Sequence, residues 1–147
     1  MAKRLDHPYA PTRRAWRKVK GRASAEAIVG GILGSLRAPA ALVLGRPDET
    51  GRLRVAGRTG PIPRHVRAAV GAALQPAGGW HPWPDKLPSA RFGNAAPVDF
   101  MRVEPALVVE LAVDAAVDVV RGRPLWRHPA RLIRVRHDLR AADLKPF

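Results

Sequence analysis

The 147-residue sequence contains no cysteine and few histidines, and these shortages exclude several classes of site. Without cysteine there is no disulfide framework and no thiolate zinc site. The five histidines have no ligand-like spacing, so we expect no metal site in the chain. No apolar run reaches the roughly 18 residues of a membrane span, and the charged N-terminus lacks the apolar core of a signal peptide. We therefore expect a cytoplasmic protein without a membrane partner.

Acidic residues are also scarce, which leaves a large positive charge. The chain has 26 lysines and arginines against 12 acidic residues, a net charge of +14. Residues 1–25 and 121–140 carry most of the excess, whereas residues 102–120 are mainly acidic. A charge of this size indicates a polyanionic partner such as nucleic acid, a nucleotide or an anionic membrane.

Hydrophobic patterning predicts five main strands and one helix. Paired glycines at Gly30 and Gly31 predict a bulge or sharp bend in the first strand. The helix, within 62–79, follows from apolar residues at Val66, Val70 and Leu74. A helix is also conceivable for 103–120, but β-branched residues favour a strand at least to 113. The expected strands are 26–34, 42–46, 53–58, 103–113 and 131–136.

The order of these elements indicates a fold class. A helix between the third and fourth of five short antiparallel strands is the pattern of the OB-fold, a mainly β, five-stranded barrel. The face and loops of such a barrel often bind nucleic acid. Residues 80–97 are expected to form a long proline-rich loop between the helix and the fourth strand.

The stretch RHPARLIRVRHDL, residues 127–139, carries four arginines. In a regular strand Arg134 and Arg136 would share the outer face, with Ile133 and Val135 facing the core. Two neighbouring guanidiniums repel each other unless an anion lies between them. Alternatively, they form a merely solvated strand face.

Together with WRKVK (16–20), this stretch resembles motifs of the ATP-dependent DNA ligases, in the covalent nucleotidyltransferase superfamily. The resemblance covers nearly the whole chain. It divides the chain into a lead-in from the end of an adenylation domain, 1–25, and an OB-fold domain, 26–147, with motif VI at 127–138. The motif VI matches are Arg127, Pro129, Arg134, Arg136 and Asp138; the motif V matches are Trp16, Lys18 and Lys20; Lys3 stands at the motif IV lysine.

The resemblance implies what the anion would be. Motif VI arginines would orient the β,γ-phosphates of ATP during lysine adenylation, and the motif V lysines would contact the nucleotide phosphate. Planar bidentate donors suit such a role. The implied cofactors are ATP and, with the adenylation domain, Mg²⁺; the implied partner is nicked double-stranded DNA. Asp138 would pair with a motif arginine or cap the strand end.

The ligase nucleophile is the departure from the family. None of the five lysines begins a Lys-x-Asp-Gly motif. We therefore expect the chain to be inactive alone and to need an adenylation domain, in cis or in trans. Whether it is an enzyme part or a stand-alone nucleic-acid-binding module stays open, and an RNA-capping relative is a weaker alternative.

Other basic and aromatic residues have two readings each. Four hairpin arginines would contact the DNA backbone or simply be solvated: Arg46, Arg52, Arg54 and Arg58. The tryptophans would stack on bases or pack the mouth of the barrel: Trp16, Trp80, Trp83 and Trp126.

Overall fold

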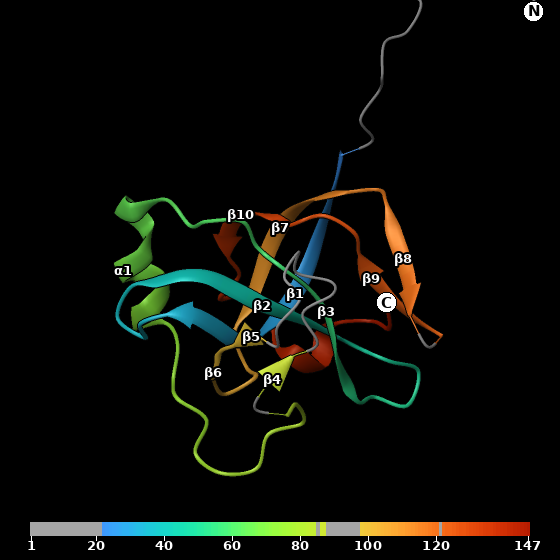
Figure 1. Ribbon diagram of the computed structural model, residues 1–147, viewed down its shortest axis with the longest axis horizontal. Coiled ribbons are helices and arrows are strands. Elements are labelled where there is room, and N and C mark those ends of the chain that lie inside the picture. Colours follow the sequence, from blue (N-terminus) through green and yellow to red (C-terminus); the bar gives the residue numbers. More distant parts are fainter. Residues whose placement is uncertain (1–21, 85, 88–97, 121) are drawn as a thin grey trace, which may run out of the picture.

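The computed structural model describes residues 22–84, 86–87, 98–120 and 122–147. These residues form a mainly β structure with one α-helix (Figure 1), which confirms the mainly β part of the expected class. The five-stranded OB barrel itself stays a prediction. Four predicted nucleotide-binding residues lie outside the described residues: Lys3, Trp16, Lys18 and Lys20. The division of the chain at residues 25 and 26 stays a prediction.

The main sheet has six strands. Its neighbours run in the order β10-β7-β1-β2-β3, all antiparallel, with the short β6 also paired to β1. These strands are β1 (Arg22–Gly34), β2 (Pro39–Pro47), β3 (Leu53–Arg58), β6 (Met101–Arg102), β7 (Val108–Asp114) and β10 (Arg131–Val135). Each of the five predicted strands is thus present, but the fourth begins at Val108 rather than at Val103.

Two small two-stranded sheets, one α-helix and one 3₁₀ turn complete the described part. In Figure 1, the helix and the β8–β9 hairpin lie on opposite sides of the main sheet. The elements are α1 (Arg64–Ala72), β4 (Lys86–Leu87), β5 (Val98–Asp99), β8 (Val117–Val120), β9 (Arg123–Trp126) and a 3₁₀ turn (Ala141–Asp143).

The two edge strands of the main sheet meet at one point. Thr59, just after β3, forms a parallel bridge with Ala130, just before β10. The Gly60 N–H donates to the Ala130 carbonyl, and the Ala130 N–H donates to the Arg58 carbonyl, both at 2.9 Å. The buried Thr59 hydroxyl accepts from the Leu42 N–H at 2.9 Å. The main sheet therefore curls far enough for the segments beside its two edge strands to form this one bridge.

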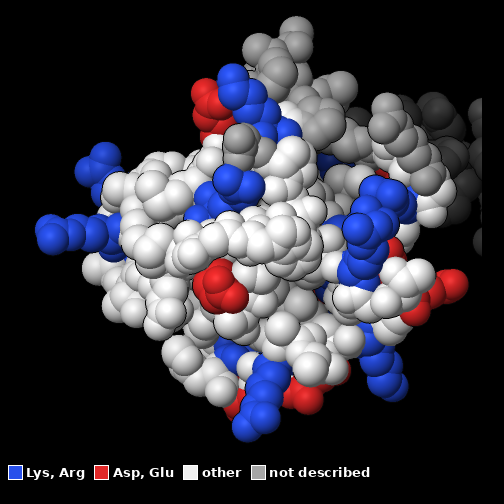
Figure 2. Space-filling view, turned by 90° about the horizontal axis from the view of Figure 1, so that it is seen from below, with Lys and Arg blue, Asp and Glu red and all other residues white. Residues whose placement is uncertain are grey.

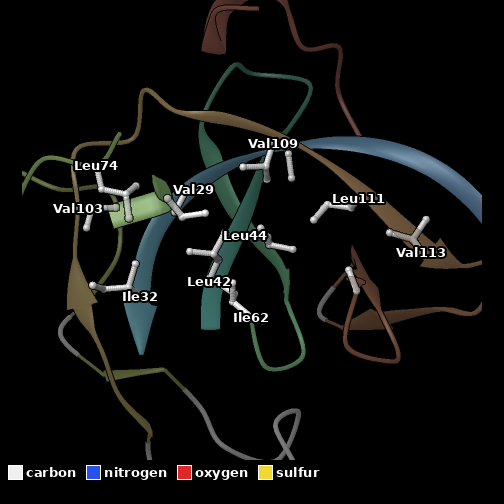
Figure 3. Packing of buried hydrophobic residues seen from close by; sticks show 13 residues of the cluster. Val29, Ile32, Leu42, Leu44, Ile62, Leu74, Val103, Val109, Leu111 and Val113 are labelled. Carbon is white, nitrogen blue, oxygen red and sulfur yellow. The ribbon is translucent and has the colours of Figure 1, made fainter. Parts of the chain in front are cut away.

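The core lies inside this curl (Figure 3), where apolar side chains of β1, β2 and β7 meet. Val70 of helix α1 and Leu74 just after it close one end of the core. The helix is shorter than predicted, and Leu74 lies in the turn after it. The core residues drawn and labelled are Val29, Ile32, Leu42, Leu44, Ile62, Leu74, Val103, Val109, Leu111 and Val113.

The paired glycines of β1 form the predicted bulge and also lie against two aromatic rings. The register with β2 shifts between Val29 and Gly31, which is the expected bulge. A Cβ at Gly30 would lie 2.4 Å from the Trp83 ring, and one at Gly31 would lie 2.3 Å from the Phe100 ring. Both positions are glycine because aromatic rings press against the backbone there.

One local expectation fails, and one hairpin was not foreseen. Ile133 is 47% exposed rather than facing the core. The pairing of β10 with β7 shifts between Leu132 and Arg134, so Ile133 is the extra residue of a bulge and the alternation breaks. The β8–β9 hairpin, with its positive-φ Gly122, was not predicted because its segment reads as the tail of the preceding strand.

Candidate functional site

Three neighbouring strands bring charged residues into one row. Glu26 of β1 pairs in register with Glu110 of β7, and Glu110 pairs with Arg134 of β10. Like charges directly opposite each other on a sheet are destabilising. The two glutamates therefore need cations beside them, and β10 supplies these.

The arginines of β10 and its extension meet three carboxylates. Arg134 donates from Nε to Glu110 Oε2 at 2.6 Å. Arg136 donates from Nε and Nη2 to both carboxylate oxygens of Asp138, at 2.9 and 2.8 Å, and from Nη1 to Glu26 at 3.3 Å. The anion beside the arginine pair is thus carboxylate from the chain itself. We call Glu26, Glu110, Arg134, Arg136 and Asp138 the arginine–carboxylate cluster.

The charged groups of this cluster nearly balance one another and shift one another's pKa values. Two guanidiniums and three carboxylates give a local formal charge of 2 − 3 = −1. The hydrogen bonds with Asp138 raise the pKa of Arg136 above its ordinary value. The same bonds hold the pKa of Asp138 down at about 2. The Arg136 side chain is 17% exposed and Arg134 61% exposed, so Arg134 is the more accessible of the two.

A groove of about 270 Å³ opens beside Arg136. Its lining includes Glu104, His137 and the residues just before β7, but Arg134 is not part of it. The arginine pair therefore does not line one shared pocket in this conformation, and the arginine–carboxylate cluster lies on the surface of the sheet.

Arg127, the fourth predicted residue of this motif, is placed apart from the cluster. It lies just after β9, and its Nε donates to Asp118 Oδ1 of β8 at 2.8 Å. Within the described part of the chain, no hydrogen bond or ion pair joins it to the cluster. The structure thus brings together Arg134, Arg136 and Asp138 and not Arg127.

The four hairpin arginines have different surroundings. Arg46 donates to the carbonyls of Glu26 and Lys145, both at 2.7 Å, and lies 5.8 Å from the Phe147 ring centroid. Burial lowers its pKa. Arg54 pairs with Asp48 at 2.9 Å, Arg58 is half-buried on β3, and Arg52 is exposed at the turn. Arg46 therefore fastens the C-terminal segment to β2, and Arg52 is the most available of the four.

Charge on the visible surface is dispersed. Figure 2 shows lysine and arginine side chains in separate groups, several with acidic side chains beside them, rather than one continuous basic patch. The residues of the arginine–carboxylate cluster that the sequence reasoning missed are Glu26 and Glu110. The acidic excess of residues 102–120 was the available signal, but it does not specify which strand lies opposite.

Magnesium does not fit the described residues of this chain. The structure holds no group of three potential ligands among them that could bind a metal ion. The three carboxylates of the cluster are already engaged by arginines. We derive no chemical step through Mg²⁺ here.

Among the described residues, no helix combines the length and apolar character needed to cross a membrane.

Comparisons with known proteins give a fold and no family. No family model matches the chain, and no curated protein sequence matches it. Among solved structures, it is similar to the ligase domain of LigD from M. tuberculosis, with a TM-score of 0.61 and 22% identity. It is also similar to mycobacterial DNA ligase D complexed with ATP and MES, with a TM-score of 0.57 and 23% identity.

The likeness is to part of each of those chains. It covers 86% of this chain, but 39% of the first structure and 38% of the second. The described part of this chain therefore has a ligase-like fold, and it spans about two fifths of the length of the ligase structures that it resembles.

Proposed function

We propose that this chain is the OB-fold portion of an ATP-dependent DNA ligase, which clamps ATP phosphates and nicked duplex DNA while an adenylation domain, in cis or in trans, supplies the nucleophile. The observation that carries this proposal is the ligase-like fold over 86% of the chain. The Arg-x-Arg-x-Asp motif within that fold, on and after β10, adds chemistry suited to phosphate.

The order of elements supports the OB assignment. Strands β1, β2 and β3 form a meander, α1 follows β3, and β7 and β10 complete the main sheet on the other side of β1. The contact of Thr59 with Ala130 brings the third and fifth of these strands together. A curled sheet of five main strands with one helix between the third and fourth is the arrangement expected of this fold.

The carboxylates of the cluster suggest how the arginines work. In the described conformation Glu110 and Asp138 occupy the donors that phosphate oxygens would need. Phosphate and carboxylate accept the same paired hydrogen bonds from a guanidinium. Engagement with nucleotide would therefore exchange one acceptor for another, and the arginines would stay hydrogen-bonded before and after.

Reconstitution with a separately purified ligase adenylation domain tests the proposal. Transfer of labelled AMP from ATP to the lysine of that domain is measured with wild-type chain and with the double variant Arg134→Ala, Arg136→Ala. We expect the wild-type chain to stimulate this transfer and the double variant not to stimulate it. Arg131→Ala is the matched control, because it removes an exposed arginine of the same strand outside the cluster.

Arg136 is mostly buried, so circular dichroism must first show that the double variant is folded. The single variant Arg134→Ala, at the more exposed position, gives an independent reading if it is not. Full stimulation by a folded double variant, or an equal loss with Arg131→Ala, would end the motif VI assignment.

A stand-alone nucleic-acid-binding module is the second candidate, favoured by the net charge of +14. If the chain neutralises about six phosphates of duplex DNA, the logarithm of its affinity should fall with the logarithm of salt concentration at a slope of about −5. Tight, salt-dependent binding with no effect on adenylation would favour this module over a ligase part.

A further inference from the structure

The three described tryptophans have different environments. Trp83 is buried at 4% exposure, and Trp126 is half-buried with its ring centroid 5.0 Å from that of Phe147. Trp80 is 85% exposed. Of the two readings that the sequence leaves for these residues, packing therefore describes Trp83 and Trp126. It does not describe Trp80.

Trp80 is presented by a fixed segment rather than by a loose one. His81, the next residue, is buried, and its Nε2–H donates to the Val103 carbonyl at 3.1 Å. Its Nδ1 accepts from the Trp83 N–H at 3.1 Å, which assigns the neutral tautomer with its proton on Nε2. Trp83 in turn donates from Nε1 to the Leu53 carbonyl of β3 at 3.1 Å.

These bonds fix the backbone directly after Trp80 against the sheet. Tryptophan offers a fold one of the largest apolar surfaces to bury. Trp80 remains in solvent although His81 and Trp83 beside it are buried and hydrogen-bonded. The fold therefore gains no stability from burying the large apolar surface of Trp80. Binding surfaces make use of such side chains.

Trp80 stands at the rim of a groove of about 430 Å³. The groove runs between the segment after α1, the β2–β3 hairpin and the 3₁₀ turn; the segment after α1 lies at the bottom of Figure 1. Arg52 and Arg54 line it, together with Leu53, Pro82 and Pro105, and none of the described residues that line it is acidic.

The two arginines of the groove are not equivalent. Arg54 is held by Asp48 from outside the groove. Arg52 is exposed at the hairpin turn, and its guanidinium forms no ion pair with a described carboxylate. The groove thus combines an exposed indole face, apolar walls and an accessible cation. A nucleotide, which joins an aromatic base to a phosphate, carries the complementary groups.

We propose that this groove binds an unpaired nucleotide of nucleic acid, with the base stacked on Trp80 and a neighbouring phosphate held by Arg52. Bases inside a duplex do not offer their faces, whereas unpaired bases do. The inference goes beyond the proposed function, because a simple nick leaves its bases paired, and it adds a contact distinct from the arginine–carboxylate cluster.

The test uses the 147-residue chain and a labelled oligothymidylate of about eight nucleotides, within the range that one OB-fold covers. Fluorescence anisotropy of the label gives the affinity. We expect Trp80→Ala to weaken binding by about 5- to 150-fold, the range for loss of one stacked base, and Trp80→Phe to retain most of it. Arg52→Gln should weaken binding severalfold.

The matched charge control is Arg64→Gln, which removes an exposed arginine from α1, outside the groove. It should leave the affinity within about twofold of wild type, because Arg64 does not line the groove. A blunt duplex of the same length is the ligand control, and Trp80→Ala should leave its binding unchanged. Trp80 is exposed, so its replacement should not affect folding.

Three outcomes would overturn the inference. Trp80→Ala could bind the oligothymidylate as tightly as wild type does. It could lose duplex binding in equal measure, which would make Trp80 a duplex contact. It could instead lose association with the adenylation domain, which would make this face a protein contact. The adenylation assay does not use single strands, so failure here and failure of the proposed function are distinguishable.

Discussion

Glu110 holds an arginine that the proposed function needs for phosphate, and its replacement by glutamine tests that relation. Glu110 Oε2 lies 2.6 Å from Arg134 Nε, and its side chain is 19% exposed. Glutamine keeps the shape and an acceptor oxygen but removes the charge. The formal charge of the cluster then rises from −1 to 0. We expect Glu110→Gln to bind inorganic pyrophosphate more tightly than wild type does.

The size of the gain follows from Coulomb's law. A phosphate oxygen bound to Arg134 would lie on the order of 5 Å from the Glu110 carboxylate, because both contact the same guanidinium. Two unit charges at that separation repel by about 1–2 kcal/mol at an effective dielectric constant of ~40–80. That corresponds to roughly 5- to 30-fold in affinity, and physiological salt favours the lower end.

The stability of the fold should change little in this variant. The ion pair with the mostly exposed Arg134 is worth about 0.2–1 kcal/mol. Repulsion between Glu110 and its cross-strand neighbour Glu26 is of similar size and opposite sign. A change in affinity can therefore be separated from a change in folding, which urea unfolding would detect.

The assay is a titration with pyrophosphate, followed through the arginine side-chain Nε–H signals in nitrogen-15 NMR, which reports millimolar affinities. Glu49→Gln, at the exposed β2–β3 turn, is the control with the same change in net charge. Equal affinities of Glu110→Gln and wild type would refute the reasoning. So would a gain that persists in the double variant Glu110→Gln, Arg134→Ala.

Three further outcomes follow from the fold. Gly30→Ala should destabilise the protein by about 1–3 kcal/mol in urea unfolding, because its Cβ would meet the Trp83 ring at 2.4 Å, and the penalty should vanish in a Trp83→Leu background. Gly71→Ala should destabilise the protein despite the higher helix propensity of alanine, since its Cβ would lie 2.4 Å from a backbone carbonyl oxygen. Thermal unfolding checks this, with Gly79→Ala as the control because a Cβ there meets nothing within 4 Å. The pKa of Asp138 is held at about 2, below its usual 3.8, so its stabilising contribution is complete above about pH 4 and is lost as pH falls to about 2; melting curves of Asp138→Asn should lack that part of the pH dependence.

Features that depend on neighbours in the sequence were predictable. The hairpin of β2 and β3 is an example, because the chemistry of its turn is local. The Asp48 carboxylate accepts from the N–H groups of Thr50 and Arg52, at 2.9 and 3.0 Å. Asp and Gly in such a turn are a recognisable signal. The strand ending near 113 was predictable for a similar reason, since alternation continues through Leu111 and Val113.

Features that depend on tertiary contact were not predictable. The sequence shows Gly30 and Gly31 as a bend, but it does not show that Trp83 and Phe100, more than 50 residues later, press on them. Similarly, Arg46 reads as one more hairpin cation. Only the fold brings the Lys145 carbonyl and the Phe147 ring next to Arg46. Through these contacts Arg46 holds the C-terminal segment against β2.

The question of which anion faces the arginines shows the same limit most clearly. Alternation places Arg134 and Arg136 on one outer face, but the bulge at Ile133 sets where each points. The carboxylates that meet them come from β1, β7 and the segment after β10, so strand register decides the pairing. A bare pair of arginines would repel and would need phosphate to be stable. Because Glu26, Glu110 and Asp138 satisfy them internally, the pair is stable without phosphate, and any phosphate must compete with three carboxylates. Under the proposed function, the affinity for phosphate would therefore be set as much by the acids as by the arginines, and the acids are the residues to vary first.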